Sequence, residues 1–381
     1  MSRISLWLQV VVLLVWAVPG AAAADGFVRV TDGDRLQLLD DGDPEDLGRA
    51  LANSLRYFAA RREAGGSGAA LAQIAEAGAF AEAAARFAAL REQLSPGEIG
   101  RRWAEHFDLY QWRQGLLVTG YFEPELRGSL CRDGTFRYPL FGVPADLDDS
   151  GRRSWRRQER LLYSYPSRGQ IEEQGLLSGQ ELLWVDDAVA RFILHVQGSG
   201  RVRLPDGEIL RLQYAGNNGR PYRSIGRLLV EQGVMELNQV SMPRIEEYLR
   251  ARPEEAGRLM QANDRYIFFR ASATGLDVGP AGSLGYPLVA GRSVAADPAV
   301  YPAGALAFLV TTQPRFAEDG RLSGWVSLRR FVTIQDAGAA ITGPGRLDFF
   351  WGAGTYAARA AGIMKQPGRL YLLVPKGSGG T

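Results

Sequence analysis

The feature that most constrains the fold is a series of short apolar segments that begins at Gly115. The first, Gly115 to Glu123, contains β-branched and aromatic residues and stops at Pro124. Such segments, bounded by glycine, proline and aspartate, are typical of β-strands. Later segments of the same character are Tyr266–Phe269, Leu306–Thr311, Arg330–Ile334, Arg346–Phe350 and Leu370–Val374. The chain after residue 115 is therefore predicted to be mostly β.

A hairpin is predicted in the middle of the chain. Arg201–Leu204 and Glu208–Tyr214 flank Pro205-Asp206-Gly207, whose residues favour a tight turn. The apolar run Ala190–Gln197 is predicted as a strand that leads into this hairpin through Gly198-Ser199-Gly200.

Helices are predicted before residue 108 and again between the hairpin and Tyr266. They carry apolar residues at intervals of three and four, and several have a capping residue or a proline at the start. Asp43 is placed to cap the first, and Ser224 and Ser241 the last two. The predicted helices are Pro44–Glu63, Ala70–Leu94, Pro96–Phe107, Ser224–Gln232 and Met242–Ala262. The expected fold class is mostly β with a helical N-terminal part.

The first 24 residues resemble an export signal. Arg3 precedes the apolar stretch Leu6–Val18, and Ala22-Ala23-Ala24 provides a small-residue cleavage site. The apolar stretch is shorter than the ~20 residues that span a bilayer. A lipid anchor would need a cysteine at the cleavage site, and the only cysteine is Cys131. We therefore expect a soluble periplasmic protein, which could associate with the outer membrane only by other means.

Composition excludes several classes of function. The 44 basic and 42 acidic residues leave a formal charge of +2, which gives no reason to expect a nucleic-acid partner. The two histidines, His106 and His195, lack a metal-ligand spacing, and no glycine-rich motif has the context of a nucleotide site. We therefore expect no metal and no cofactor. His195 is interpreted as a strand residue and Cys131 as a core or turn residue.

Carboxylates remain to carry catalysis, and Asp297, Asp336 and Asp348 stand in apolar or glycine-rich surroundings. Desolvation by apolar neighbours raises the pKa of a carboxylate and suits it to proton transfer. Asp336 and Asp348 flank the turn Gly343-Pro344-Gly345, so a strand–turn–strand unit would bring them near each other. Two close carboxyl groups, one of them protonated, are an arrangement that cleaves glycosidic bonds.

These aspartates allow two other interpretations. Any one of them taken alone could be a turn residue whose carboxylate accepts backbone N–H groups. Asp336-Ala337-Gly338 is similar to the loop of aspartic proteases, which need two such loops with Thr or Ser in the middle. This chain has one loop, with alanine there, so that class is set aside.

Several short motifs occur in order from residue 115 to residue 375. Those of the middle part are Val118–Pro124, Gln197–Gly200, Tyr214–Gly219, Asn263–Phe269 and Pro287–Ser293. Those of the last part are Asp297 with Tyr301–Gly304, Asp336–Gly343 and Asp348–Gly352. Together they resemble the membrane-bound lytic murein transglycosylase A family, whose last part is a three-aspartate domain shared with other cell-wall proteins.

The resemblance implies a double-ψ β-barrel catalytic domain formed by both chain ends, an inserted second β-domain and a groove between them. The barrel domain would take residues 25–123, with the N-terminal helices, and 269–375. The insert would take residues 124–268, after a signal peptide at 1–24 and before a flexible tail at 376–381. The reaction would cleave the β-1,4 bond between N-acetylmuramic acid and N-acetylglucosamine without water, leaving 1,6-anhydro ends during cell-wall turnover and remodelling.

The resemblance also implies roles for individual residues. Asp348 would be the general acid and then the general base, with Asp336 in support. Asp297 would be structural and hold the loop with Tyr301-Pro302. Residues expected to contact the glycan are Thr119, Gly120, Tyr121, Gln197, Ser199 and Trp351. The family usually has glycine where this chain has Ala339, which places a Cβ where glycine would permit a positive φ.

Two alternatives stay open from the sequence. A hydrolase would use Asp336 to activate water, with the carboxyl groups ~6.5–9.5 Å apart. A non-catalytic wall-binding protein would bind the glycan by aromatic stacking. In each case the expected partner is the peptidoglycan glycan strand. We expect a monomer, with a complex of cell-wall enzymes as a further option.

Overall fold

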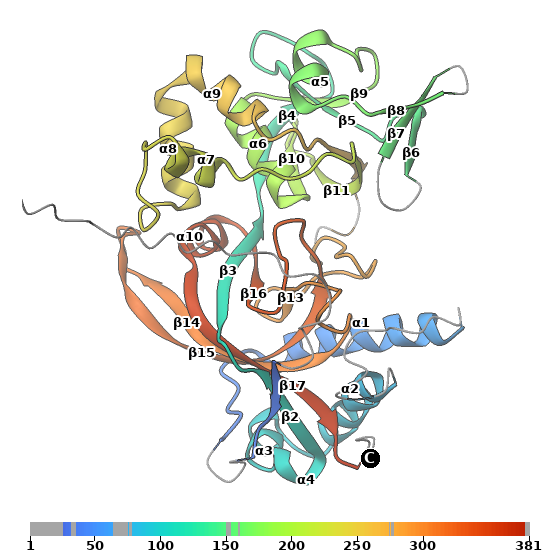
Figure 1. The fold of residues 1–381 in the computed structure, drawn as a ribbon, viewed down its shortest axis with the longest axis vertical. Coiled ribbons are helices and arrows are strands. Elements are labelled where there is room, and N and C mark those ends of the chain that lie inside the picture. Colours follow the sequence, from blue (N-terminus) through green and yellow to red (C-terminus); the bar gives the residue numbers. More distant parts are fainter. Residues whose placement is uncertain are drawn as a thin grey trace, which may run out of the picture.

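The computed structural model describes residues 26–31, 36–63, 75, 78–149, 154–158, 161–273, 275 and 278–377. The expected signal peptide and residues 378–381 of the expected tail lie outside the described residues. Figure 1 shows a barrel below and a second part above, which is formed by a single central stretch of the chain. The barrel combines the early strand β3 with late strands in orange and red, so both chain ends build it.

Six strands close the barrel: β3 (Leu116–Glu123), β13 (Ser293–Ala295), β14 (Leu306–Phe316), β15 (Leu322–Asp336), β16 (Arg346–Ala353) and β17 (Lys365–Pro375). Their order is β17-β14-β15-β13-β16-β3, and the pairing of β3 with β17 closes the sheet. β16 is parallel to β3 and β13 is parallel to β15, whereas the other neighbours are antiparallel. Beyond β17, β2 (Phe107–Trp112) and β1 (Phe27–Arg29) extend the sheet.

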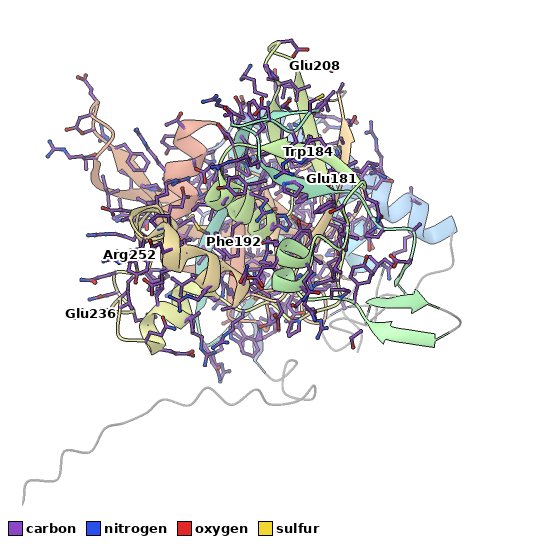
Figure 2. The ribbon with its side chains drawn as sticks, turned by 90° about the horizontal axis from the view of Figure 1, so that it is seen from above. Glu181, Trp184, Phe192, Glu208, Glu236 and Arg252 are labelled. Atoms are coloured by element: carbon purple, nitrogen blue, oxygen red, sulfur yellow. The ribbon has the colours of Figure 1, made fainter. Side chains whose placement is uncertain are left out.

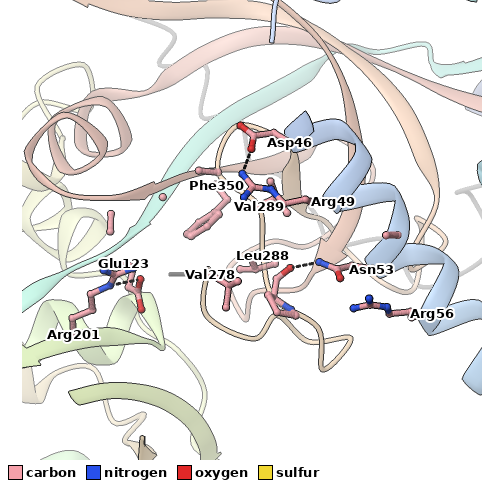
Figure 3. Close-up of a pocket in the computed structure, with 16 residues that line it drawn as sticks. Asp46, Arg49, Asn53, Arg56, Glu123, Arg201, Val278, Leu288, Val289 and Phe350 are labelled. Atoms are coloured by element: carbon pink, nitrogen blue, oxygen red, sulfur yellow. Dashed lines mark hydrogen bonds and ion pairs between the residues drawn. The ribbon is translucent and has the colours of Figure 1, made fainter. Parts of the chain in front are cut away.

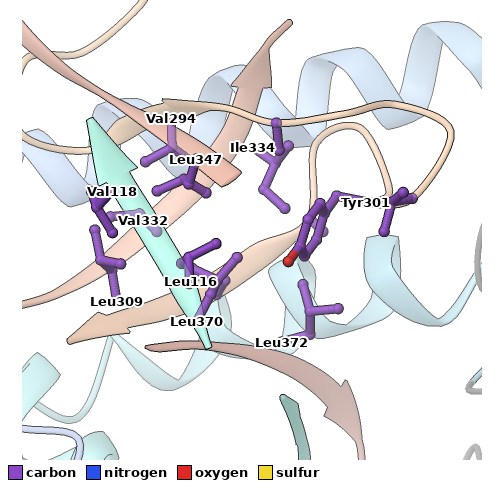
Figure 4. Packing of buried hydrophobic residues seen from close by; sticks show 14 of the residues in the cluster. Leu116, Val118, Val294, Tyr301, Leu309, Val332, Ile334, Leu347, Leu370 and Leu372 are labelled. Atoms are coloured by element: carbon purple, nitrogen blue, oxygen red, sulfur yellow. The ribbon is translucent and has the colours of Figure 1, made fainter. Parts of the chain in front are cut away.

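Alternate residues of these strands fill the barrel interior, as expected for a barrel of this size. Val118, Leu309, Val332, Leu347 and Leu372 come from five different strands, and none of them is exposed. Figure 4 shows these side chains converging between the strands. Each such burial stabilises the fold by roughly 1.5–3 kcal/mol relative to an exposed side chain.

Helices cover one outer face of the barrel. α1 (Pro44–Glu63) and α2 (Ala79–Leu90) pack Leu51 and Phe87 against Phe308 and Phe331 of the barrel strands. α1 has the predicted limits, and the Asp43 carboxylate accepts the N–H of Glu45 at 2.7 Å. α10 (Thr355–Ile363) lies beside β3 and β16.

Two predicted helices differ in extent. Of the predicted helix Ala70–Leu94, only Ala79–Leu90 is helical among the described residues. The predicted helix Pro96–Phe107 is divided into α3 (Pro96–Arg101) and α4 (Trp103–His106). Ser95 caps α3 through a reciprocal bond with Glu98, and Phe107 already has extended backbone and begins β2.

The upper part contains a six-stranded sheet, in the order β12-β11-β10-β4-β9-β5. Its strands are β4 (Glu125–Ser129), β5 (Tyr138–Phe141), β9 (Glu181–Val185), β10 (Gly200–Arg203), β11 (Ile209–Asn217) and β12 (Ile267–Ser272). A small sheet is formed by β6 (Leu147–Asp149), β7 (Ser154–Gln158) and β8 (Leu161–Ser164). The helices are α5 (Arg168–Gln174), α6 (Ala188–Gln197), α7 (Ile225–Glu231), α8 (Met242–Ala251) and α9 (Pro253–Gln261). The predicted hairpin is confirmed as β10–β11.

The prediction of a strand at Ala190–Gln197 is wrong, because this segment forms most of helix α6. The Asp187 carboxylate caps this helix by accepting the N–H groups of Val189 and Ala190, and Gly198 ends it with a φ of 81°. Both sides of α6 are buried, so apolar residues are spread around the helix and its sequence fits a buried strand equally well. In the view from above in Figure 2, Phe192 of α6 lies in the middle of this part.

Three smaller expectations also change. His195 is a buried helix residue whose Nδ1 accepts the N–H of Ile267 at 3.2 Å, rather than a strand residue. The predicted helix Met242–Ala262 breaks before Pro253, which has no N–H to continue it, and the side chain of Ser241 makes no capping bond. Cys131 is exposed in the turn after β4, so of the two predicted settings the turn is correct.

A buried ion-pair cluster joins the two parts where β3 leaves the barrel. The Glu123 carboxylate accepts hydrogen bonds from Arg211 at 2.6 Å and from Arg201 at 2.9 Å. The Glu123 and Arg211 side chains are each 1% exposed. Arg211 also donates to the carbonyl oxygens of Val278 and Gly279, in the segment that returns to the barrel. The cluster therefore links the two segments by which the chain passes between the barrel and the upper part.

Replacing Glu123 with Gln should lower the free energy of unfolding by about 3 kcal/mol, because two arginines lose their counter-charge and Arg211 is left buried. Urea unfolding measures this loss. Glu125→Gln is the matched control, since the Glu125–Arg203 pair on the next strand is solvent-exposed and should contribute less than about 1 kcal/mol. Equal losses in the two variants would contradict the role given to Glu123.

Candidate active site

The barrel register places four polar side chains on one surface. Asp336, Asp348 and Thr119 lie at one level of the strands, and Tyr121 lies at the next. Asp336 on β15 and Asp348 on β16 are both in register with Ala295 on the intervening strand β13. Asp348 is in turn in register with Thr119 on β3. Paired residues of neighbouring strands project to the same face, so these side chains lie on one surface together with Tyr121, two residues along β3.

Asp336 and Asp348 are therefore not partners in a simple hairpin, as the strand–turn–strand interpretation expected. The short strand β13 passes between them, which places their Cα atoms about 9–10 Å apart, twice the spacing of neighbouring strands. Each carboxylate consequently has its own set of hydrogen-bond partners.

Asp348 is held by its neighbour on β3. The Thr119 hydroxyl donates a hydrogen bond to Oδ1 of Asp348. Burial raises the pKa of Asp348, and this effect outweighs the Thr119 hydrogen bond and the Arg346 charge, which both lower that pKa. Leu347 and Phe349 on either side of Asp348 are fully buried in the barrel core and hold β16 in place. In this site Asp348 is therefore protonated over a wider pH range than an exposed aspartate would be.

Asp336 has three hydrogen-bond donors. Its Oδ1 accepts the N–H groups of Ala337 and Ser283, both at 2.9 Å, and its Oδ2 accepts the Tyr121 hydroxyl at 3.0 Å. Burial raises the pKa of Asp336; these donors lower it, and the Asp348 charge raises it further. Burial and the Asp336 charge also raise the pKa of Tyr121, which keeps its phenol a neutral donor.

Asp297 follows β13, in the loop that leads to β14. Its carboxylate accepts the N–H of Gly343 at 2.6 Å and that of Ala299 at 2.9 Å. Its carbonyl oxygen accepts the N–H of Tyr301 at 2.8 Å, in the loop it was expected to hold. These bonds connect that loop to the Gly343 turn and set the entry of β16.

Gly120 and Trp351 are not brought to the carboxylates. Both lie on the faces of their strands that point away from the carboxylates. There, Trp351 Nε1 is 3.3 Å from the Met364 sulfur, and the Trp351 ring packs on Phe349. A Cβ at Gly120 would lie 2.7 Å from Trp351 Nε1 and 2.8 Å from the Ala361 Cα. Close packing against α10 thus accounts for this glycine, and the indole is part of the same packing.

Gln197 and Ser199 lie at the end of α6. The Gln197 Oε1 accepts the N–H of Phe122 at 3.2 Å, which ties α6 to the end of β3 and leaves the side-chain NH₂ as a donor. Ser199 is half-buried in the turn between α6 and β10. Gln197 therefore borders β3 just beyond Tyr121.

Tyr222 is a candidate site residue that the sequence analysis missed. It lies between β11 and α7, forms a hydrogen bond with Ser224, and interacts electrostatically with Arg346 and Asp348. Burial raises the pKa of Tyr222, so its phenol stays protonated. The loop between β11 and α7 that carries Tyr222 is anchored by Asn218, which donates to the carbonyl oxygens of Pro166 and Asp264, each at 2.8 Å. The only signal in the sequence was an aromatic residue in a Gly- and Pro-containing loop.

Two family models match the chain: an MltA specific insert domain at residues 117–270 and a 3D domain at residues 292–374. A solved lytic transglycosylase, LtgG of Burkholderia pseudomallei, is 36% identical, with 95% of this chain and 98% of that chain covered and a TM-score of 0.53. The chain belongs to the membrane-bound lytic murein transglycosylase A family. The resemblance found in the sequence is thereby confirmed.

Other family members agree with this assignment. Membrane-bound lytic murein transglycosylase A of Vibrio cholerae is 34% identical over 266 residues, which are 68% of this chain and 66% of that protein. The chain thus spans just under two thirds of the length of this curated relative. The solved Agrobacterium tumefaciens member is 28% identical, covers 92% of this chain and 98% of its own, and has a TM-score of 0.76. Escherichia coli MltA with bound chitohexaose is 25% identical, with 92% and 95% covered and a TM-score of 0.69.

These structures and the closed six-stranded barrel together confirm the predicted fold class, mostly β with an inserted second part. Within the residues that the structure describes, no group of three or more His, Cys, Asp or Glu side chains could hold a metal ion. No helix in the same residues is long and apolar enough to cross a bilayer.

Asp348→Asn should raise the melting temperature at pH 8, and this gain should disappear near pH 3. Because the folded pKa of Asp348 is raised, its contribution to stability is fully present below the unfolded pKa of about 3.9 and is lost as pH rises through the folded pKa. Asparagine stays neutral at every pH. Calorimetric scans across this range measure the effect.

Asp319→Asn is the matched control, because hydrogen bonds from Arg321 lower the pKa of this exposed carboxyl. It should give no gain at pH 8. A lower melting temperature for Asp348→Asn at every pH would show that burial does not disfavour the Asp348 charge.

Proposed function

We propose that the protein is a lytic transglycosylase that cleaves the β-1,4 bond between N-acetylmuramic acid and N-acetylglucosamine in peptidoglycan, leaving a 1,6-anhydro end. The observation that carries the proposal is Asp348, a half-buried carboxyl group with a raised pKa that accepts a hydrogen bond from Thr119 at the barrel surface. A carboxyl group of this kind can be protonated at the start of a reaction and charged later. Membership of the family supports the same reaction.

In the first step, the Asp348 carboxyl donates its proton to the glycosidic oxygen as the bond from that oxygen to C1 breaks. In the second step, the Asp348 carboxylate takes the proton of the muramic acid 6-hydroxyl while that oxygen bonds to C1. The proton count balances without water, and one residue serves both steps because they are sequential. Thr119 would keep the carboxyl oriented throughout.

Asp336 supports the reaction rather than carrying the proton in this proposal. Its three donors hold it as an acceptor beside Tyr121, where it can position a substrate hydroxyl or N-acetyl group. Gln197 and Ser199 would bind polar groups of the glycan next to β3, and Asp297 would hold the Gly343 turn. The peptidoglycan glycan strand is the proposed substrate, in keeping with the chitohexaose complex of the E. coli relative.

Hydrolysis is a second candidate, favoured by one observation. β13 separates Asp336 from Asp348 by two strand spacings, and the two carboxyl groups of inverting hydrolases are ~6.5–9.5 Å apart to admit a water. Asp336 would then activate water, and the product would carry a reducing end.

The proposed location is the cell envelope, on the periplasmic side. The expected signal peptide and the membrane-bound naming of the relatives support it. Turnover and remodelling of the wall is the proposed role. A monomer is proposed as the working unit, with association with other cell-wall enzymes as a secondary proposal.

Asp348→Asn should reduce the rate at which purified sacculi are solubilised by about 100-fold or more, the usual contribution of a general acid–base group. Binding to sacculi in a sedimentation assay should stay within about twofold of the wild type, because asparagine keeps the shape of the side chain. Asp319→Asn serves as the control and should leave both measurements unchanged. Turnover at the wild-type rate by Asp348→Asn would rule out its proposed role.

Thr119→Val should move the alkaline limb of the pH–rate profile to higher pH. The Thr119 hydrogen bond lowers the pKa of Asp348, so its removal raises that pKa and keeps the acid protonated at higher pH. Valine is similar in shape and suits the strand. Tyr121→Phe is the comparison, because its hydroxyl bonds Asp336 and should leave this limb in place. A limb that moves with Tyr121→Phe and not with Thr119→Val would give Asp336 the role of acid.

A further inference from the structure

A pocket of about 420 Å³ lies where the two parts of the molecule meet, and Phe350 is one of the residues that line it. α1 forms one wall with Asp46, Arg49, Asn53 and Arg56, as Figure 3 shows. The opposite wall is the junction pair Glu123–Arg201, and the floor belongs to the segment 278–290 and the end of β16. Its size is within the range of small-ligand sites.

The pocket combines an apolar floor with charged walls. Val278, Leu288, Val289 and Phe350 provide the floor. Among the wall arginines, Arg201 is 2.9 Å from Glu123 and Arg49 pairs with Asp46. Arg56 has no ion pair or hydrogen bond among the residues that the structure describes. One guanidinium is thus available for a carboxylate, whereas Asp46 already has Arg49 as its partner.

The pocket shares its walls with the candidate active site. The ring of Phe350 packs against Tyr121 with centroids 5.1 Å apart, and Tyr121 donates to Asp336. The segment 278–290 that forms the floor also supplies the Ser283 N–H to Asp336. Asn53 anchors this segment by donating to the Pro287 carbonyl oxygen at 2.8 Å. A substituent of a sugar bound at the carboxylates would therefore have a short path to the pocket.

We propose that this pocket binds the carboxylate-bearing peptides that branch from the peptidoglycan glycan. The inference rests on the proposed function, which supplies the polymer. A short peptide has apolar side chains for the floor and carboxylates for Arg56. A polyphosphate fits less well, because Asp46 and Glu123 would repel it, and an uncharged sugar would leave Arg56 without a partner.

Arg56→Gln tests the proposal with two substrates, glycan strands that carry their peptides and the same strands after enzymatic removal of the peptides. On the peptide-bearing strands kcat/KM should fall roughly tenfold, as expected for loss of a charge-assisted hydrogen bond. On the bare strands it should change less than about twofold. Arg61→Gln is the matched control, because Arg61 lies on the same helix over the Tyr57 ring and is not part of the pocket lining.

Direct binding separates this inference from the proposed function. Peptides freed from the same polymer should bind the wild type saturably in a calorimetric titration, and about tenfold more weakly to Arg56→Gln. If the protein cleaves neither substrate but binds these peptides through Arg56, the pocket assignment holds and the proposed function fails. Absence of saturable peptide binding overturns the inference, as does an equal loss of kcat/KM on both substrates.

Discussion

The position of β16 between β13 and β3 is the constraint on which the candidate site depends. Leu347 and Phe349 are buried in the barrel core, and residues of a strand alternate between its faces, so Asp348 must project from the opposite face. The parallel register of β16 with β3 then brings the Thr119 hydroxyl to that carboxyl group. Closure of the barrel removes the free edges that would allow this register to slip.

The two carboxyl groups illustrate how one surface gives similar side chains different properties. Burial raises the pKa of both, but Asp336 receives three hydrogen bonds and Asp348 receives one from Thr119. The donors around Asp336 stabilise its charged form, whereas Asp348 is left with fewer groups that favour ionisation. This difference supports the assignment of proton transfer to Asp348 and of positioning to Asp336.

The inserted part completes the site only because the junction holds it in place. Glu123, Arg201 and Arg211 form a buried cluster at the point where β3 leaves the barrel, and Arg211 also holds the returning segment. Tyr222, which comes from the insert, then lies within electrostatic reach of Asp348. The same junction forms one wall of the pocket with Arg56, which connects the fold to the proposed peptide site.

Local patterns predicted much of this structure. The strands of the barrel, the hairpin β10–β11 and helix α1 follow from short segments and their turn residues, and Asp336 and Asp348 were chosen as candidate site residues from such segments. Features that depend on distant contacts could not be predicted. The insertion of β13 between the two aspartates is a non-local pairing, and the burial of α6 on both sides hides its helical periodicity. The packing of Trp351 onto Gly120 and the approach of Tyr222 likewise depend on segments far apart in the chain.

The chemistry of the product ends tests the central claim most directly. The protein would be incubated with purified sacculi, and the released muropeptides would be analysed by mass spectrometry beside those from Asp348→Asn. The proposed mechanism predicts products lighter by one water than reducing muropeptides, and none with the variant. Products with reducing ends would contradict it and would assign Asp336 the activation of water.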